Sequence, residues 1–269
     1  MLNPLHEKNM IRLVLAALVM IFLVLSAPPA IAQEQPDERL LTDPTDPGYE
    51  KPMANYDPWE GFNRSMYKFN YGVDKYFFLP VVRAYKFILP DVVETGIANF
   101  FKNLFEINNV GNNLLQGNAE GVVNSTFRIV FNSTLGLGGI LDPATPMGFY
   151  KMEEDFGQTL GVWGAGPGPY LVLPVLGPST VRDGIGSGVD SMANSIWLTA
   201  LVNSVVSGTG DRDRLYYGLT GLNIINQRAS VPFRYYETGS PFEYDLVRYV
   251  YLKDRQIKIE QDRQMVSDQ

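Results

Sequence analysis

The sequence predicts a mainly α-helical protein with one irregular segment, and three observations support this prediction. Apolar residues recur at alternating steps of three and four in several segments, which places them on one face of a helix. Good capping residues open some of these segments, as in Asp57-Pro58-Trp59-Glu60 and Ser240-Pro241-Phe242-Glu243. Residues 161–178, by contrast, hold too many Gly and Pro residues for a regular helix.

The first 32 residues have the composition of a secretory signal peptide. Lys8 and Arg12 precede an unbroken apolar run over 13–25, and the small residues Ala30 and Ala32 mark a cleavage site. Because a helix needs about 20 apolar residues to cross a bilayer, the run favours cleavage after Ala32 over a permanent span. Residues 33–56 are rich in Pro and charges and have no apolar period, so they predict a disordered tether.

The mature chain is acidic, which narrows its partners. Once residues 1–32 are removed, 20 Lys and Arg residues stand against 28 Asp and Glu residues. Basic residues form no cluster within this acidic sequence. We therefore expect no nucleic-acid partner, because phosphate backbones are recognised by concentrated positive charge.

Reactive side chains are scarce. The sequence has no Cys, and its single His, His6, lies in the signal segment. Hydrolysis by Ser-His-Asp or Cys-His groups and zinc sites of His or Cys are therefore excluded for the mature chain. Carboxylate pairs and oxygen-ligated metals remain open, but the acidic run 153–155 is better explained as the solvated start of a helix. We expect no catalytic residue, no metal and no cofactor.

Two predicted helices carry wide apolar faces. The first begins at Asp57, and its stripe consists of Trp59, Phe62, Met66, Phe69 and Val73 as far as Pro80, with Asn63 and Asn70 beside it. The second begins at 91–94, and its apolar side is broadened by Phe100, Phe101, Leu104 and Phe105. We expect these aromatic, Leu and Met side chains to face a membrane. The alternative for the second set is that it fills an ordinary core.

The Gly- and Pro-rich segment 161–178 is the most unusual part of the chain. Non-helical backbone is costly in a membrane unless it lines a cavity or is covered by protein. We therefore expect this segment to line a cavity or to be covered by protein. The alternative is a buried loop and a short edge strand of an ordinary globular protein.

The remaining sequence predicts further helices over 119–134, from Thr180, and over 211–228, while the Asn-rich stretch 108–113 is expected to interrupt the pattern. A helix from Ser240 leads into a polar tail over 256–269, so the helical domain spans 57–255.

The glycines at 184–188 lack the Lys and Ser or Thr of a nucleotide-binding loop. Arg182 and Asp183 are expected to form a surface pair, although contact with a phosphate headgroup is an alternative.

Five motifs, in order, resemble those of the MlaA (VacJ) family. They are DPWEGFNR at 57–64, NFF at 99–101, NSTLGLGG at 132–139, DFGQTLG at 155–161, and the run from GPY at 168–170 to GPSTVRD at 177–183. The resemblance covers about residues 55–255. Several long motifs in one order are far more specific than any single glycine pattern.

The resemblance implies a multi-helix, ring-like, membrane-embedded protein with a central amphipathic channel. Such a protein sits in the inner leaflet of the bacterial outer membrane, often beside trimeric porins. It implies non-enzymatic transport, in which misplaced phospholipids leave the outer leaflet and pass to an MlaC-like periplasmic carrier that serves an inner-membrane ABC transporter. Many family members are lipoproteins, whereas this sequence has no Cys for that anchor. We expect apolar helices, a porin or an uncleaved signal helix to hold the protein at the periplasmic face.

Two other classes of function are compatible with a single sequence. A structural envelope protein would use the same helices to dock on a porin or on the membrane without moving lipid. A phospholipid hydrolase would need a nucleophile and a base, and the mature chain offers no plausible pair. We therefore expect phospholipid transport that maintains outer-membrane lipid asymmetry. With the resemblance, the Gly/Pro segment predicts a lipid passage; the expected lining residues are Gly161, Trp163, Gly164, Gly168, Pro169, Tyr170 and Leu171, with Asn63 and Asn70 as polar groups beside it.

Overall fold

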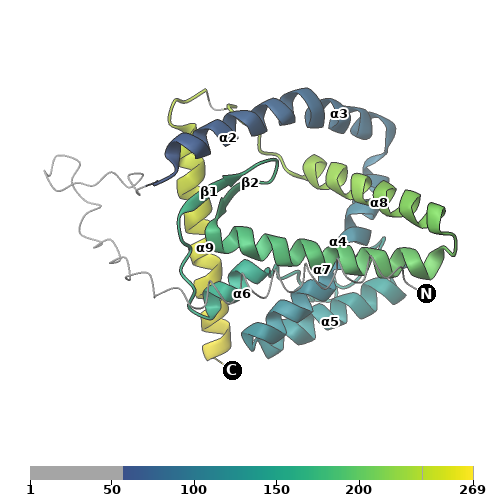
Figure 1. Cartoon of the computed structure of the whole chain (residues 1–269). Coiled ribbons are helices and arrows are strands. Elements are labelled where there is room, and N and C mark those ends of the chain that lie inside the picture. Colours follow the sequence, from purple (N-terminus) through teal and green to yellow (C-terminus); the bar gives the residue numbers. More distant parts are fainter. Residues whose placement is uncertain (1–56, 238, 269) are drawn as a thin grey trace, which may run out of the picture.

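The computed structural model describes residues 57–237 and 239–268, so the signal peptide and tether expected over 1–56 lie outside the described residues. Within the described part of the chain, helices account for almost all of the regular structure, and one two-stranded hairpin is the exception (Figure 1). The prediction of a mainly α-helical protein is confirmed.

The first helical rod combines three elements. Helix α2 (Glu60–Val73) continues through a π-helical turn, η2 (Asp74–Phe78), into α3 (Leu79–Ile88). The sequence suggested that the stripe ends at Pro80, but the helix continues, and Pro80 stands in the first α-helical turn after the π-helical turn. The result is a long rod that crosses one side of the molecule in Figure 1.

The helices begin two residues later than the capping patterns at 57–60 and 240–243 predict. Helix α2 begins at Glu60 and α9 (Glu243–Ser267) begins at Glu243, and neither has a side-chain cap. Asp57 accepts the amide of Trp59 at 3.0 Å, just before α2, and also accepts the hydroxyl of Tyr244 in α9. Glu243 accepts the hydroxyl of Tyr67 in α2 at 2.7 Å. Both acidic groups therefore make tertiary contacts.

Helices α4 (Asp91–Gln116) and α5 (Ala119–Thr134) pack together, and the bounds predicted for α5 are confirmed. The predicted break at 108–113 is wrong, because α4 runs straight through it. Asn112 accepts the hydroxyl of Thr159 at 3.0 Å, and Asn109 accepts the amide of Glu154 at 3.1 Å. These tertiary hydrogen bonds outweigh the modest helix propensity of Asn.

The second half of the chain contains α6 (Phe156–Val162), the hairpin β1 (Tyr170–Leu173) and β2 (Gly177–Thr180), α7 (Val181–Val205) and α8 (Thr209–Ser230). The strands are antiparallel, with Tyr170 opposite Thr180. Helix α9 continues to Ser267, where the sequence predicted a polar tail over 256–269. This end is helical because it packs on α6, which buries Ile259 and Asp262.

The elements close into a ring. Helix α2 contacts β1, β1 contacts α7, α7 contacts α8, and α8 contacts α3, which returns to α2 through η2. Figure 1 shows the rod of α2 and α3 on the opposite side of this ring from α7. The ring-like helical arrangement implied by the family resemblance is therefore confirmed.

Polarity is distributed unusually between the interior and the surface. Among the described residues, 25 buried side chains are polar or charged and 14 are apolar. Two small apolar clusters flank the rod, one around Tyr67 and Tyr170 and one around Val82 and Tyr85. In contrast, 34 large apolar or aromatic side chains of this described part of the chain are exposed. In the described segments, every helix is too short or too polar to cross a bilayer by itself.

Candidate functional site

Two asparagines of α2 hold the hairpin in place. Asn63 donates to the carbonyl of Tyr170 (3.0 Å) and accepts the amide of Val172 (2.8 Å). Asn70 donates to the carbonyl of Leu173 (2.9 Å) and accepts the amide of Val175 (2.7 Å). These are hydrogen bonds of the kind that a third strand would make to an open edge. The sequence placed Asn63 and Asn70 beside a passage, and the structure makes them the supports of β1.

The beginning of α2 is also fixed to α9. Asp57 accepts from Asn63 at 3.0 Å, accepts the hydroxyl of Tyr244, and pairs with Arg248 at 3.5 Å. The Asp57 side chain is fully buried. The hairpin, α2 and α9 therefore form one hydrogen-bonded corner of the ring.

Helices α6 and α7 cross at two glycines. A Cβ atom on Gly186 would lie 2.3 Å from the backbone N of Gly157 and 2.6 Å from its Cα. Only glycine fits such an approach, which gives one of the glycines at 184–188 a packing role. The crossing brings the N-terminus of α6, with Asp155, close to the N-terminus of α7, with Asp183.

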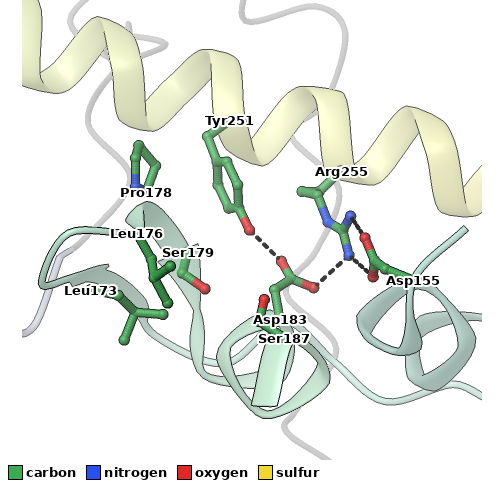
Figure 2. A pocket seen from close by; sticks show the side chains of 9 residues that line it. All are labelled: Asp155, Leu173, Leu176, Pro178, Ser179, Asp183, Ser187, Tyr251 and Arg255. Atoms are coloured by element: carbon green, nitrogen blue, oxygen red, sulfur yellow. Dashed lines mark hydrogen bonds and ion pairs between the residues drawn. The ribbon is translucent and has the colours of Figure 1, made fainter. Parts of the chain in front are cut away.

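Arg255 of α9 joins these two carboxylates (Figure 2). Its Nη1 lies 2.5 Å from Asp155 Oδ2, and its Nη2 lies 2.8 Å from Asp155 Oδ1 and 3.0 Å from Asp183 Oδ1. Arg182 also donates to Asp183 Oδ1, at 2.9 and 3.0 Å, and Tyr251 donates to Asp183 Oδ2 at 2.9 Å. Arg182 and Asp183 form a buried pair instead of the surface pair that the sequence suggested.

The charges of this network stabilise one another. Burial by itself would raise the pKa of Asp183, but Arg255 and Arg182 outweigh it and hold that pKa below its ordinary value. Burial opposes the charge of Arg255, yet Asp155 and Asp183 raise its pKa further above the ordinary value. Two carboxylates and two guanidinium groups thus form a net-neutral cluster.

A cavity of about 230 Å³ lies between this network and the hairpin. One wall is apolar, and the other carries charges and hydroxyls; the lining residues are Leu173, Leu176, Pro178, Ser179, Ser187, Tyr251, Asp155, Asp183 and Arg255. Figure 2 shows the hairpin side chains on one side of the view and Arg255 with Asp155 on the other. Such a lining suits a molecule with one polar and one apolar end. Within the described residues, no group of three or more acidic side chains is arranged to hold a metal ion.

The predicted passage residues fall elsewhere. Tyr170 is wrong as a lining residue, because its ring is buried in the aromatic cluster of Tyr67 and Tyr244. Gly161 belongs to the last turn of α6, where a Cβ would lie 2.6 Å from Ile259 Cδ1. Leu171 is half-buried, and the exposed members are Trp163, Gly164, Gly168 and Pro169. The cavity is lined instead by the end of the hairpin and by α7 and α9.

The predicted membrane-facing residues divide into three groups. Trp59, Phe62 and Phe69 are about half exposed, at 43%, 51% and 49%. Four others are half-buried, and of these Met66 packs on the aromatic cluster; they are Met66, Phe100, Leu104 and Phe105. Phe101 is wrong as a lipid-facing residue, because it is only 3% exposed and shares the buried face of α4 with Asn112 and Gln116.

Sequence reasoning missed Arg255 and Tyr251. Both stand in a strongly charged helix whose pattern resembles a solvated surface. It also assigned the acidic run 153–155 to solvent, whereas Glu154 is buried and accepts from Gln116 at 2.9 Å and Gln158 at 2.7 Å. Asp155 and Asp183 lie within the family-like motifs, so the acidic half of the network carried the signal.

The comparison with protein families decides where this fold belongs. The model of a family described as MlaA lipoprotein matches residues 55–258. The chain belongs to the MlaA family. An MlaA relative of Escherichia coli, named an intermembrane phospholipid transport system lipoprotein, is 41% identical over 150 residues, which cover 53% of this chain and 59% of the relative.

The chain is similar to further curated proteins. A protein of the same name from Haemophilus influenzae is 34% identical over 50% of this chain and 55% of its own length. An uncharacterised protein of Rickettsia prowazekii is 39% identical over 48% of this chain and 51% of its own length. The chain thus spans about half the length of the curated relatives it matches.

A solved structure supports the same MlaA assignment. It is described as the structural basis for maintenance of bacterial outer membrane lipid asymmetry. It aligns with a TM-score of 0.58 and 29% identity, over 76% of this chain and 100% of that chain. The MlaA relatives of E. coli and H. influenzae are named lipoproteins, whereas the 269 residues of this chain include no Cys.

Proposed function

We propose that this protein transports phospholipids without covalent chemistry, removing misplaced molecules from the outer leaflet of the bacterial outer membrane. The observation that carries the proposal is the reversed polarity: residues 57–237 and 239–268 have 25 buried polar and 14 buried apolar side chains, beside 34 large exposed apolar or aromatic ones. A soluble monomer rarely exposes so much apolar surface, because water is a poor solvent for it. Hydrocarbon around the outside of the ring removes that cost.

In this proposal the rod of α2 and α3 lies sideways in the inner leaflet. Trp59, Phe62 and Phe69 project away from the buried face of Asn63 and Tyr67, and Phe77 and Phe87 continue the exposed apolar surface at 60% and 91% exposure. Each such side chain contributes roughly 1.5 to 3 kcal/mol when it leaves water. A handful therefore matches the contribution of a lipid anchor.

The cavity between the hairpin and the charge network is the proposed place where a lipid enters the ring. Its polar wall suits a headgroup, while Leu173, Leu176 and Pro178 suit the first part of the acyl chains. Asn63 and Asn70 act as positioning residues, because they hold the strand that bears Leu173. The exposed Gly/Pro loop before β1, from Trp163 to Pro169, would line the outer part of the route together with Leu171.

We further propose an MlaC-like carrier as the periplasmic acceptor, and a trimeric porin as a neighbour in the membrane. The name of the E. coli relative, which places it in an intermembrane phospholipid transport system, supports a lipid as cargo. The solved structure that aligns with this chain concerns maintenance of outer membrane lipid asymmetry, which supports removal of phospholipid from the outer leaflet. The periplasmic face of the outer membrane is the proposed location.

The test uses a bacterium that lacks its own family member. Cells complemented with this protein are expected to keep phospholipid out of the outer leaflet, measured by labelling lipids accessible at the cell surface. Leu176→Asp places a charge on the apolar wall and is expected to lose most of the complementation. Leu176→Met is the matched control and should retain it, because it preserves the apolar wall.

Two outcomes would contradict the proposal. If the Leu176→Asp variant, at normal abundance, complements as well as the unchanged protein, then the cavity is not on the lipid route. If deletion weakens the envelope without raising surface phospholipid, the protein is a structural component that docks on the membrane or a porin. Purified protein that cleaves labelled lipid would reveal an enzyme instead.

A further inference from the structure

The charge balance of the cavity wall limits the kind of headgroup that fits. Both carboxylates that line the cavity, Asp155 and Asp183, are already paired with Arg255, and Arg182 pairs with Asp183 from outside the lining. These four charges balance one another, and the buried carboxyl group of Asp190 lies close enough to Asp155 to interact with it. An anionic headgroup would bring an uncompensated negative charge to a wall without an unpaired cation. A cationic headgroup would find both carboxylates of the lining already paired with Arg255. A buried charge without a partner is strongly disfavoured, so a net-neutral group fits this wall better than either.

The wall nevertheless offers one donor and one acceptor for a ligand. Within the described residues, the Nε–H group of Arg255 is buried and has no hydrogen-bond partner, and Arg255 is only 8% exposed. Both Nη atoms bind Asp155, so Nε lies on the side of the guanidinium turned away from that carboxylate, as Figure 2 shows. An oxygen of a phosphodiester would satisfy this donor.

The acceptor is Asp155, whose side chain is 40% exposed. It receives two bonds from Arg255 and one from the amide of Gln158 (2.8 Å). A carboxylate has about four acceptor positions, so one remains for an ammonium group. The exposed hydroxyl of Ser187 stands on the same cavity and can serve either end of the headgroup.

The size of the cavity limits how much of a lipid enters. Its volume of about 230 Å³ is below the roughly 300 to 1,000 Å³ of sites that enclose a drug-sized ligand. It can hold a headgroup with its glycerol, while the acyl chains stay outside along the apolar wall. The wall near the chains carries Leu173, Leu176 and Pro178.

We propose that this cavity receives the headgroup of a zwitterionic, net-neutral phospholipid, such as a phosphoethanolamine lipid, in preference to an anionic one. The phosphate takes the Nε–H of Arg255, and the ammonium group lies near Asp155 and Ser187. This inference rests on the proposed transport function, and it adds the class of lipid that the site selects.

The experiment measures which lipid the full chain retains. Purified protein in mild detergent is mixed with equal amounts of phosphatidylethanolamine and phosphatidylglycerol, and the bound lipids are quantified by mass spectrometry after a second purification. We expect phosphatidylethanolamine to be enriched about fivefold. Ser187→Lys adds an unpaired cation to the wall and is expected to reverse the preference toward phosphatidylglycerol by about the same factor.

Ser191→Lys is the matched control. Ser191 is exposed on the same helix one turn away and does not line the cavity, so its change adds equal charge outside the site. Its lipid ratio should stay that of the unchanged protein. Leu176→Lys, on the opposite wall, should act in the same direction as Ser187→Lys and guards against a folding defect in one variant.

Each remaining outcome overturns a stated claim. Equal retention of both lipids by the unchanged protein would overturn the headgroup preference and leave transport intact. Retention of neither lipid would overturn transport and the preference together. Equal shifts of the lipid ratio in Ser187→Lys and Ser191→Lys would mean that an added positive charge anywhere on the surface attracts phosphatidylglycerol, and that the cavity does not select the headgroup. A separate experiment tests binding of soluble glycerophosphoethanolamine. If the protein binds this molecule but shows no preference between the two lipids, the cavity is a site for a soluble zwitterion and not for a lipid headgroup.

Discussion

Helices α2 and α9 both bury polar side chains, but they use opposite chemistry. Helix α2 turns the neutral amides of Asn63 and Asn70 inward and binds the backbone of β1 with them. Helix α9 turns Arg255 and Asp262 inward and contacts α6 through charged groups. Neutral hydrogen bonds do not change with pH, whereas the charged contacts depend on the ionisation of every partner. Asn63 also contacts one carboxylate, Asp57, but the groups that bind the hairpin itself are neutral. The hairpin side of the cavity is therefore expected to depend less on pH than the other side.

The largest effect is expected from removing the charge at the centre of α9. Arg255→Met leaves Asp183 buried with one fewer guanidinium and Asp155 with none. We expect a loss of about 4 kcal/mol in the free energy of unfolding, measured with denaturant in detergent. Lys258→Met, which removes an exposed pair with Asp254, is the control and should lose less than about 0.5 kcal/mol. Similar losses of stability in the two variants would show that the buried charges of α9 contribute no more than an exposed ion pair.

A smaller loss is expected from α2. Asn63→Leu keeps the side-chain size but leaves the amide of Val172 and the carbonyl of Tyr170 without these partners. We expect a loss of about 2 kcal/mol, equal at pH 6 and pH 8, with faster hydrogen exchange at the Val172 amide. Ser65→Ala, on the exposed side of α2, should be nearly neutral. A loss that varies strongly with pH would show that the hairpin side is coupled to the charges after all.

The smallest effect is expected from a pair of buried carboxyl groups where α9 packs on α6, and it tests the pH dependence of that side. Glu154 and Asp262 are buried carboxyl groups that share the Nε2 donor of Gln158, at 2.7 and 3.5 Å. Burial, followed by the neighbouring Glu154, raises the pKa of Asp262 from its ordinary 3.8 to about 7. The native state therefore holds a proton that the unfolded chain has released, and this contribution to stability falls as pH rises from about 4 to 7.

Asp262→Asn should remove that dependence. We expect the variant to be about 1 kcal/mol more stable than the unchanged protein at pH 8, with a flatter curve between pH 4 and 7. Burial also raises the pKa of Asp190, to about 6, so a smaller slope in the same direction should persist. A variant with an unchanged slope would mean that the pair does not share a proton.

The sequence was informative where the cause of a structure is local. The bounds of α5 and the start of α7 after Thr180 followed from caps and apolar spacing, because those signals lie within a few residues of the helix ends. The family-like motifs already contained Asp155 and Asp183, half of the charge network.

What the sequence did not reveal depends on partners far along the chain. The Asn-rich part of α4 is helical because Asn112 meets Thr159, and Arg255 is buried because it meets Asp155, 100 residues away. Asn and Arg are normally surface residues, so no periodic pattern marks them as interior. The same cause misplaced Phe101, whose buried face is otherwise made of polar side chains.

Closure of the ring also sets an order of assembly. Asn63 meets the carbonyl of Tyr170 across 107 residues, and α3 meets α8 later still in the chain. Since a ribosome makes α2 first, this helix must wait with its aromatic face uncovered while its amides have no strand to hold. Long-range closure of this kind is slow. We therefore expect the nascent chain to depend on a chaperone or an early encounter with lipid, and an isolated N-terminal fragment to aggregate.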